Sequence, residues 1–368
     1  MTNAPTIYRL DRAQLADVLA DQPAYRLDQL WDGLYAERRD IGDISPLPAA
    51  LRADLARRFP PALTPVTEQT ADRGATRKWL WSLADGHQVE TVLMDYDDRS
   101  TVCVSTQVGC AMACGFCATG LAGFDRHLDT GEIVEQIVRA ARAAQPRRLS
   151  HVVFMGMGEP LANYGPTRAS LLRCRDDLSL SARHLTVSTV GIVPGIDRLA
   201  REGLPVTLAV SLHAANDPLR DRLVPINKRY PLEELTAACR RWIDATGRRI
   251  SFEWAMIHEV NDSAADARQL AEIAGPLRAH VNLIPLNATD GAPATASTPS
   301  SIDEFRAVLT HSGVNVTVRA NRGTDIDAAC GQLRQRTNTV RPAPVRIAST
   351  STSPSRTTPP DQTTDRSS

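Results

Sequence analysis

Apolar residues recur every three or four positions in the first part of the chain. The positions that follow this spacing are Leu15, Val18, Leu19, Leu27, Leu30, Trp31 and Leu34. Such spacing places apolar side chains on one face of a helix. Pro23 and the stretch 40–48 separate the pieces. We therefore expect a small helical accessory domain over residues 1–62.

From Arg77 onward the apolar period changes to two, which is typical of strands. The runs 78–83 and 88–94 flank Asp85-Gly86, a pair that favours a tight hairpin turn. A third run follows at 101–105. We expect residues 63–100 to form a linker and a small β-hairpin extension.

Beyond residue 130, helix and strand patterns alternate. Strands are expected at 151–155, 185–190, 206–212, 250–257, 281–286 and 315–319, and helices at 130–144, 195–201, 232–245, 264–277 and 302–310. This repeat predicts an α/β fold with a parallel sheet covered by helices. With the strand at 101–105, about six or seven strands fit an incomplete (β/α)6-type barrel over residues 101–336. In barrels the working residues stand at the C-terminal ends of the strands.

After residue 336, Pro, Ser, Thr and Arg dominate the sequence as far as Ser368. This composition provides almost no large apolar side chains for a core. We therefore expect a disordered tail over residues 337–368.

Charge gives no indication of a partner, because 42 Lys and Arg balance 42 Asp and Glu. Any RNA contact would need local basic patches. The candidates are Arg147-Arg148, Arg240-Arg241, Arg248-Arg249, Arg319 and Arg322. The chain has no apolar run near the length of a membrane span. Seven cysteines without a signal peptide argue against a secreted disulfide protein, so we expect a cytoplasmic one.

Three cysteines stand close together at Cys110, Cys114 and Cys117, with C-x3-C-x2-C spacing. Thiolates suit iron–sulfur clusters or zinc. A closed zinc site needs a fourth ligand, and the nearest histidine, His127, lies ten residues further on. Three thiolates on a cubane cluster leave one iron open, and S-adenosylmethionine can bind such an iron. Chance spacing and a zinc knuckle are the alternatives.

This cysteine triplet resembles the signature of the radical S-adenosylmethionine superfamily. Its flanks, together with two later motifs, resemble the RlmN and Cfr family of RNA adenine methyltransferases. The matching stretches are 107–110, 116–120, 156–160 and 322–332, and the resemblance runs from about residue 89 to 333. It implies a radical S-adenosylmethionine partial barrel, with a helix-hairpin-helix-like accessory domain that contacts RNA.

The resemblance also implies cofactors: one 4Fe–4S cluster on Cys110, Cys114 and Cys117, and two S-adenosylmethionine molecules per turnover. Residues that match the family's cofactor-binding positions are Gly158, Glu159, Ser188, Ser211, Leu212, His213 and Asn287. Without the resemblance, the glycine-rich stretch would be read as an ordinary turn, and Ser188 and His213 as structural residues. Leu286 stands where the family often has phenylalanine.

Three further residues match the family's catalytic positions: Glu90, Cys103 and Cys330. Adenine C2 is electron-poor, so a carbon radical adds to it more readily than an ordinary methyl cation equivalent. The resemblance implies that Cys330 is methylated and carries the radical to the ring. Glu90 would accept the proton from the adduct, and the Cys103 thiolate would release the RNA through a transient disulfide with Cys330. Taken alone, Glu90 would be a surface carboxylate and Cys330 a buried apolar thiol.

As the resemblance implies, the expected activity is formation of 2-methyladenine in 23S rRNA, at the peptidyl transferase centre, and in the anticodon loop of tRNA. The implied partners are these RNAs and a flavodoxin- or ferredoxin-like electron donor, with the protein acting as a monomer. An adenine-C8 enzyme that confers antibiotic resistance is the alternative within the family. The long N-terminal helical segment and the amino-acid sequence of residues 156–159 favour methylation at C2. A non-enzymatic iron–sulfur RNA-binding protein is the alternative from another class.

Overall fold

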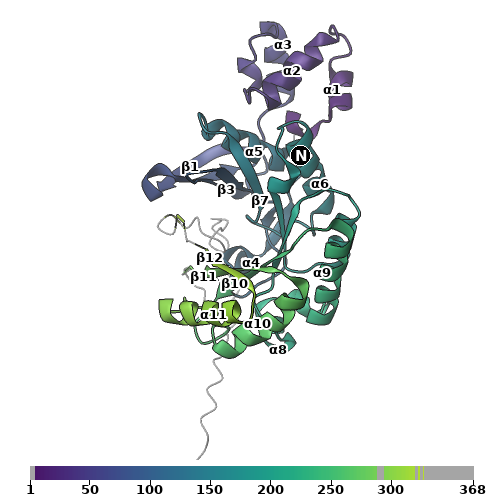
Figure 1. Cartoon of the computed structure of the whole chain (residues 1–368). Helices are drawn as coiled ribbons and strands as arrows, with labels where there is room; N and C mark the ends of the chain where they lie inside the picture. Colours follow the sequence, from purple (N-terminus) through teal and green to yellow (C-terminus); the bar gives the residue numbers. More distant parts are fainter. Residues whose placement is uncertain (1–4, 288–293, 320–321, 324–325, 327–368) are drawn as a thin grey trace, which may run out of the picture.

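The computed structural model describes residues 5–287, 294–319, 322–323 and 326. Within them, ten strands form one sheet in the order β1-β2-β3-β4-β7-β8-β9-β10-β11-β12 (Figure 1). Their bounds are β1 Thr64–Ala71, β2 Thr76–Ser82, β3 Gln88–Asp95, β4 Ser100–Cys103, β7 Leu149–Phe154, β8 Leu185–Thr189, β9 Thr207–Ser211, β10 Ser251–Met256, β11 His280–Pro285 and β12 Asn315–Val318. Strands β5 Gln107–Gly109 and β6 Phe124–His127 pair separately.

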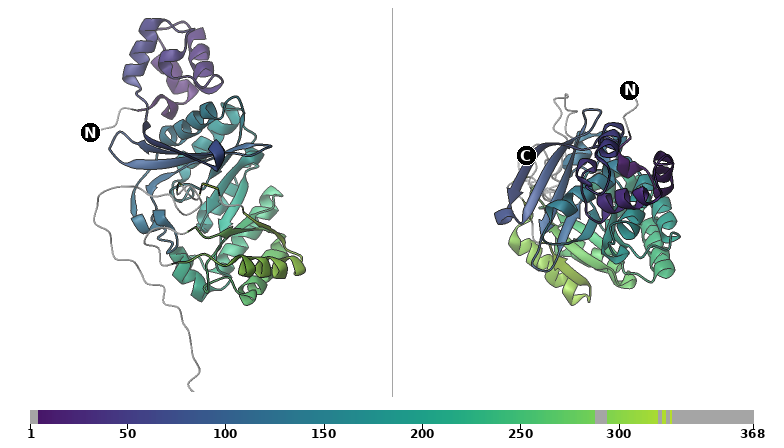
Figure 2. Two further views of the ribbon diagram at one scale, coloured as in Figure 1. Left: turned by 90° about the vertical axis from the view of Figure 1, so that its left-hand side faces the viewer. Right: turned by 90° about the horizontal axis from the view of Figure 1, so that it is seen from above.

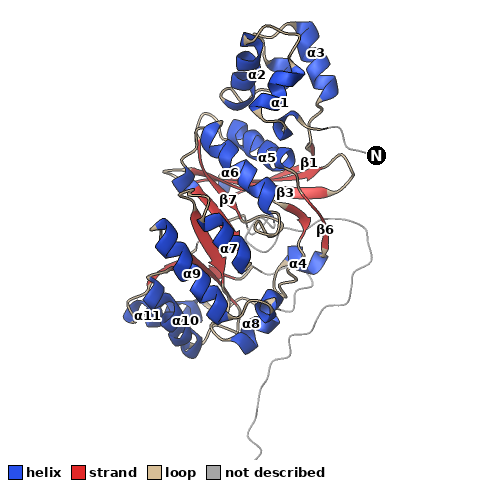
Figure 3. Ribbon diagram, turned by 90° about the vertical axis from the view of Figure 1, so that its right-hand side faces the viewer, coloured by secondary structure: helices blue, strands red, loops and turns tan. Residues whose placement is uncertain are grey.

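From β4 through β7 to β12, every neighbouring pair of strands is parallel. The helices that link them are α5 Thr130–Ala143, α6 Tyr164–Asp176, α7 Val193–Ala200, α8 Asp217–Leu223, α9 Leu232–Thr246, α10 Ala264–Leu277 and α11 Pro299–His311. Helices α5, α6, α7 and α9 cover one face of the sheet (Figure 3). The expected incomplete α/β barrel is confirmed.

Helix α5 begins where the sequence specifies it. The Asp129 carboxylate accepts the Glu132 amide at 2.9 Å, and the Glu132 carboxylate accepts the Asp129 amide at 2.9 Å. This reciprocal cap satisfies two backbone groups that the first turn leaves unpaired. Apolar residues such as Ile133 and Ile137 then recur at helical spacing and are fully buried.

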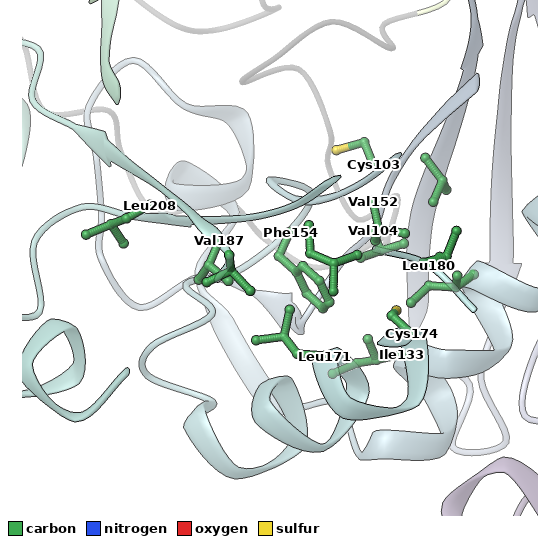
Figure 4. Packing of buried hydrophobic residues seen from close by; sticks show 14 of the residues in the cluster. Cys103, Val104, Ile133, Val152, Phe154, Leu171, Cys174, Leu180, Val187 and Leu208 are labelled. Atoms are coloured by element: carbon green, nitrogen blue, oxygen red, sulfur yellow. The ribbon is translucent and has the colours of Figure 1, made fainter. Parts of the chain in front are cut away.

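The core lies between the helices and the outer face of the parallel strands. Alternate residues of the strands, among them Val152, Phe154 and Val187, point to this face and are fully buried. Figure 4 shows them packed with residues of the helices, including Cys174. Cys174 and Cys239 are fully buried in this cluster and are core residues.

The expected hairpin is present, because β2 and β3 pair antiparallel from Thr76↔Met94 to Ser82↔Gln88. The structure adds a strand, β1, which pairs antiparallel with β2 where a linker is expected from the sequence. Most residues of β1 are exposed at the edge of the sheet. Its sequence is therefore polar and lacks the apolar alternation that reveals β2 and β3.

Three short helices precede the sheet: α1 Arg12–Val18, α2 Tyr25–Tyr35 and α3 Ala49–Arg58. They lie at one end of the molecule, beyond the β1–β3 extension and α5 (Figure 2). Two α5 side chains hold this region. The Glu135 carboxylate accepts the Ala62 amide at 2.8 Å, and the Arg142 guanidinium pairs with Asp40 at 2.7 Å. The helical unit is therefore fixed to the first helix of the barrel.

Further short elements are α4 Ala118–Ala122 and the single-turn helices Ile7–Arg9, Ile41–Asp43, Asp72–Gly74, Ala182–His184 and Pro225–Lys228. In the part of the chain that is described, no helix is long and apolar enough to cross a membrane.

Candidate active site

The three cysteines of the triplet stand on the loop from β5 to α4. Cys114 is buried, and Cys110 and Cys117 are partly buried. Burial raises the pKa of Cys110 to about 12 and that of Cys114 well above its usual range, and the Cys117 thiol raises both further. Three thiols within electrostatic reach of one another resist ionising together. A cationic metal cluster removes that resistance, because it stabilises each thiolate.

Three thiols on one loop are the kind of donor set that binds a cubane cluster. Among the described residues, no three or more His, Cys, Asp or Glu side chains converge on the position of a single ion. A 4Fe–4S cluster needs no such convergence, because each thiolate binds a different iron at a different corner. The loop is held at its base, where the Cys110 amide donates to the Gly123 carbonyl at 2.7 Å.

Phe116, between the second and third cysteines, connects this loop to the barrel. Its ring meets the His213 ring edge-to-face, with 4.7 Å between centroids. Cys114 and Phe116 belong to a small apolar cluster with residues from β10, α8 and the loops that follow β9, α8, β10 and β11, namely Ala214, Leu219, Leu223, Val224, Ala255, Ile257 and Leu286. The cysteine loop therefore packs over the C-terminal ends of the strands.

The glycine-rich stretch after β7 runs directly against the chain that leads into the cysteine loop. A Cβ on Gly156 would lie 2.7 Å from the Val104 carbonyl carbon. A Cβ on Gly158, whose φ is +104°, would lie 2.6 Å from the Gln107 Cβ. Real side chains do not tolerate such distances, so both positions need glycine for this close approach of two backbones.

Glu159 follows these glycines and is buried. Its carboxylate accepts the Leu161 amide at 3.0 Å and the Val190 amide at 2.8 Å. Burial raises its pKa to about 7. The side chain thus ties the glycine-rich stretch to the end of β8. That Gly158 and Glu159 bind the cofactor stays a prediction.

The other predicted cofactor-binding residues are brought to one edge of the sheet. Ser188 on β8 and Ser211 on β9 have their hydroxyl oxygens 3.5 Å apart. Leu212 and His213 come directly after β9, and Asn287 is buried two residues after β11. These residues come from strands that are far apart in the sequence, and parallel pairing places them side by side. Their predicted role agrees with this placement and stays a prediction.

His213 is held as a neutral imidazole. Its Nδ1 accepts the Ala255 amide at 3.0 Å, which leaves the proton on Nε2. Burial and the nearby Arg220 lower the pKa of His213 to about 3. Its φ of 58° is unusual for a residue with a side chain, so the loop after β9 is strained at this position.

Arg220 on α8 is a site residue that sequence reasoning missed. Its side chain is fully buried and donates to the Leu212 carbonyl at 3.0 Å and the Val190 carbonyl at 2.6 Å. Burial lowers its pKa to about 10. The guanidinium joins the ends of β8 and β9 beneath Cys114. Its sequence context looks like an ordinary amphipathic helix, so no local signal marks it.

Glu90 and Cys103 lie on the inner face of the sheet, on neighbouring strands. Cys103 is opposite Val92 in the register of β3 and β4, and Glu90 is two positions from Val92, so the two side chains are diagonal neighbours. Figure 4 shows the Cys103 sulfur pointing away from the core side chains Val104 and Phe154. The two predicted catalytic residues therefore share one face.

Lys78 on β2 completes this group and was not predicted. Its ammonium lies 3.3 Å from the Glu90 carboxylate, and both side chains are almost fully buried. The ammonium favours the ionised carboxylate. Ser105 links the group to the glycine-rich stretch, because its hydroxyl donates to the Glu90 carbonyl at 2.6 Å and accepts the Met157 amide at 3.0 Å.

After β12 the chain returns to the β-hairpin extension. The Arg322 guanidinium stacks on the Tyr96 ring at 4.3 Å and donates to the Asp95 carbonyl at 3.0 Å. The Gly323 amide donates to the Asp72 carboxylate at 3.2 Å. Arg322 therefore anchors the chain rather than standing open to phosphate. Cys330 lies outside the described residues.

Comparison with known proteins agrees with this architecture. The family model of the radical SAM superfamily matches residues 104–271. A radical SAM methyltransferase from Sphaerobacter thermophilus superposes with a TM-score of 0.87 at 50% identity, covering 90% of this chain and 99% of that one. The fold, the cysteine loop and this match define a radical S-adenosylmethionine enzyme.

Curated relatives narrow the class. A protein of Frankia alni named probable dual-specificity RNA methyltransferase RlmN is 50% identical to this chain, over 88% of this chain and 81% of that protein. A protein of the same name from Thermobifida fusca is 48% identical, over 88% of this chain and 93% of that protein. The chain belongs to the RlmN family of RNA methyltransferases.

Proposed function

We propose that this protein is a radical S-adenosylmethionine RNA methyltransferase that forms 2-methyladenine in 23S rRNA, at the peptidyl transferase centre, and in the anticodon loop of tRNA. Family membership supports the class of reaction. The observation that supports the chemistry is that Glu90 and Cys103 are diagonal neighbours on the inner face of the sheet. We place the enzyme in the cytoplasm with its RNA substrates and a flavodoxin- or ferredoxin-like donor.

The residues present fit the family's cofactors. Cys110, Cys114 and Cys117 would hold the 4Fe–4S cluster, and the strand ends that carry Ser188 and Ser211 would hold S-adenosylmethionine. When bound, these groups supply carbon-radical chemistry, which suits addition to an electron-poor ring carbon. The buried apolar cluster around Cys114 and Phe116 shields the site from water.

The inner face of the extension would then serve the release of the RNA. Lys78 lies 3.3 Å from the Glu90 carboxylate, which would accept the proton from the adduct carbon. The adduct would also pass its unpaired electron to a one-electron acceptor, for which the oxidised 4Fe–4S cluster is the candidate, and the Cys103 thiolate would then attack the sulfur of Cys330. A sulfur–sulfur bond forms as the sulfur–carbon bond breaks, and protonation of the released carbon gives the methyl group. Later reduction of the disulfide regenerates both thiols.

The test is mass spectrometry of nucleosides. Protein reconstituted anaerobically with iron and sulfide would be incubated with S-adenosylmethionine, a reductant, and fragments of 23S rRNA or tRNA. We expect 2-methyladenosine, identified against standards of 2- and 8-methyladenosine, and one extra methyl on Cys330 in the tryptic digest. Formation of 8-methyladenosine instead would show that the enzyme methylates C8 of adenine and not C2. RNA binding without release of 5′-deoxyadenosine would show a non-enzymatic iron–sulfur protein.

A further inference from the structure

A cavity of about 970 Å³ opens inside the barrel, toward the N-terminal ends of the parallel strands. Early residues of the strands line it, including Thr186, Thr207 and Ser251. Arginines surround its mouth: Arg99, Arg183, Arg248, Arg249 and Arg319. The mouth is therefore strongly basic, although the whole chain has no net charge.

Glu253 is the one acidic side chain among the described residues that line this cavity. It is only 4% exposed. Its Oε1 accepts the Ser251 hydroxyl at 2.8 Å and the Asn282 amide at 2.9 Å. Its Oε2 is buried and has no hydrogen-bond partner among the residues that the structure describes. A buried acceptor of this kind is costly unless a ligand supplies a donor.

The orientation of Glu253 is fixed by the strands on either side. Thr317 donates to the Asn282 Oδ1 at 2.6 Å, so the Asn282 amide nitrogen must face Ser251 and Glu253. Oε1 therefore receives two donors, and Oε2 remains for a third. Glu253 is also the register partner of Ser211, so the carboxylate lies beside the predicted cofactor edge.

We infer that this cavity binds one adenosine nucleotide of the RNA, with its exocyclic amino group donating to Glu253 Oε2 and its flanking phosphates on the arginines at the mouth. The inference rests on the proposed function and deepens it by assigning base recognition. Carboxylates accept hydrogen bonds from exocyclic amino groups of bases. Adenine offers this donor, whereas hypoxanthine offers a carbonyl at the same position.

The basic mouth indicates why the ligand is a nucleotide of RNA. Arg248 is fixed by a hydrogen bond to the Val206 carbonyl at 2.9 Å, and burial together with the neighbouring Arg183 lowers its pKa. Arg99 pairs with Asp98, whereas Arg183 and Arg249 pair with no described carboxylate. Cations held next to one another favour an anion between them, and phosphates are the anions that RNA provides. S-Adenosylmethionine has an adenine amino group but no phosphate.

The first experiment uses the unmodified reconstituted protein. Its affinity for a short RNA hairpin is measured by fluorescence anisotropy, with adenosine, purine riboside or inosine at the target position. We expect adenosine to bind about tenfold more tightly than either analogue, because each lacks the amino donor. Equal affinity for all three hairpins would overturn the inference.

The second experiment converts Glu253 into the matching amide. In Glu253→Gln, the Ser251 and Asn282 donors hold the amide oxygen, so the amide nitrogen takes the place of Oε2. The cavity then presents a donor. We expect the preference to reverse toward inosine, by about tenfold. Glu272→Gln on the outer helix α10 is the control and should keep the adenosine preference. An unchanged preference in Glu253→Gln, with an unchanged melting curve, would contradict the inference.

Two further measurements distinguish base recognition from phosphate contacts and from binding of S-adenosylmethionine. Arg249→Ala should weaken binding of all three hairpins and lower the salt dependence of binding by about one phosphate contact, whereas Arg268→Ala on α10 should not. S-Adenosylmethionine affinity is measured by calorimetry. A loss of that affinity in Glu253→Gln, with RNA preference unchanged, would assign the carboxylate to the cofactor and overturn the inference. A preference for adenosine without formation of methyladenine would refute the proposed function but would still support adenosine binding in this cavity.

Discussion

The cysteine loop and the β-hairpin extension contribute to one site, but different forces hold them. Around the cysteine loop, side chains form hydrogen bonds with backbone groups. The Glu159 carboxylate accepts hydrogen bonds from two backbone amides, and Arg220 donates to carbonyls at the ends of two strands. On the extension, side chains face one another, as Lys78 does with Glu90. We propose that the first region is a rigid scaffold for the cofactor. We propose that Glu90 on the extension and Cys103 on the adjoining strand β4, which are both buried on one face, exchange protons and sulfur bonds.

This comparison teaches that mutations in the two regions should fail in different ways. Damage to the cysteine loop should stop the reaction before it starts. Damage to the extension should leave the cofactor bound and stop the reaction later. The predictions that follow test this distinction, from the largest expected effect to the smallest.

Cys110→Ala should abolish activity entirely. The variant loses one of three thiolates, so the cluster has too few protein ligands to persist. Iron and sulfide analysis, together with the visible absorption of the reconstituted protein, would check this. Cys174→Ala is the matched control, because Cys174 is fully buried in the core and should keep the chromophore. A single tightly bound zinc without sulfide in the wild-type protein would sink the cluster assignment.

Cys103→Ala should begin turnover and then stall. Cluster binding and addition to the RNA do not need this thiol, whereas release does. We expect RNA that co-purifies with the variant through denaturing gels and disappears on RNase treatment. The double variant with Cys330→Ala should carry no such RNA. Cys239→Ala, another buried cysteine, should lose only stability. Normal turnover of Cys103→Ala without bound RNA would return Cys103 to a packing role.

Lys78→Met should slow the reaction by about 10²-fold, the lower end of what general acid–base catalysis contributes. Without the ammonium at 3.3 Å, the buried Glu90 carboxylate favours its protonated form and cannot accept a proton. Rates measured across a pH series should therefore recover in part as pH rises. Lys78→Arg should keep most of the rate, and Lys228→Met on an exposed turn should change nothing. A pH profile identical to wild type would argue against Glu90 as the base.

His213→Gln should have the smallest effect of this series on stability, and that effect should appear in the pH dependence of unfolding. Burial and Arg220 lower the pKa of His213 from 6.5 to about 3. The unfolded state therefore takes up a proton at a higher pH than the folded state does. The contribution of His213 to the free energy of unfolding is complete above about pH 6.5 and falls by about 1.4 kcal/mol per pH unit below it. Denaturant unfolding between pH 7.5 and pH 5 should show a shallower loss in His213→Gln than in wild type. The exposed His311→Gln should follow wild type.

Much of the fold was predictable because local patterns carry it. The strands β7 to β11 are largely buried and apolar, and their alternation with helices specifies a parallel sheet. The hairpin of β2 and β3 follows from Asp85-Gly86. Strand β1 escaped prediction because an exposed edge strand needs no apolar alternation. Buried partners such as Arg220 and Lys78 escaped because their roles depend on which residues they meet.

The sequence by itself determined the cysteine spacing, the glycines beside it and the order of helices and strands. These are properties of neighbouring residues, and local chemistry fixes them. The tertiary structure decided which distant residues meet: strand register places Glu90 diagonally to Cys103, and Glu253 beside Ser211. A shift of one residue in either pairing would turn those side chains to the other face of the sheet. The chemistry of the inner face is therefore a consequence of register, which only the packed core fixes.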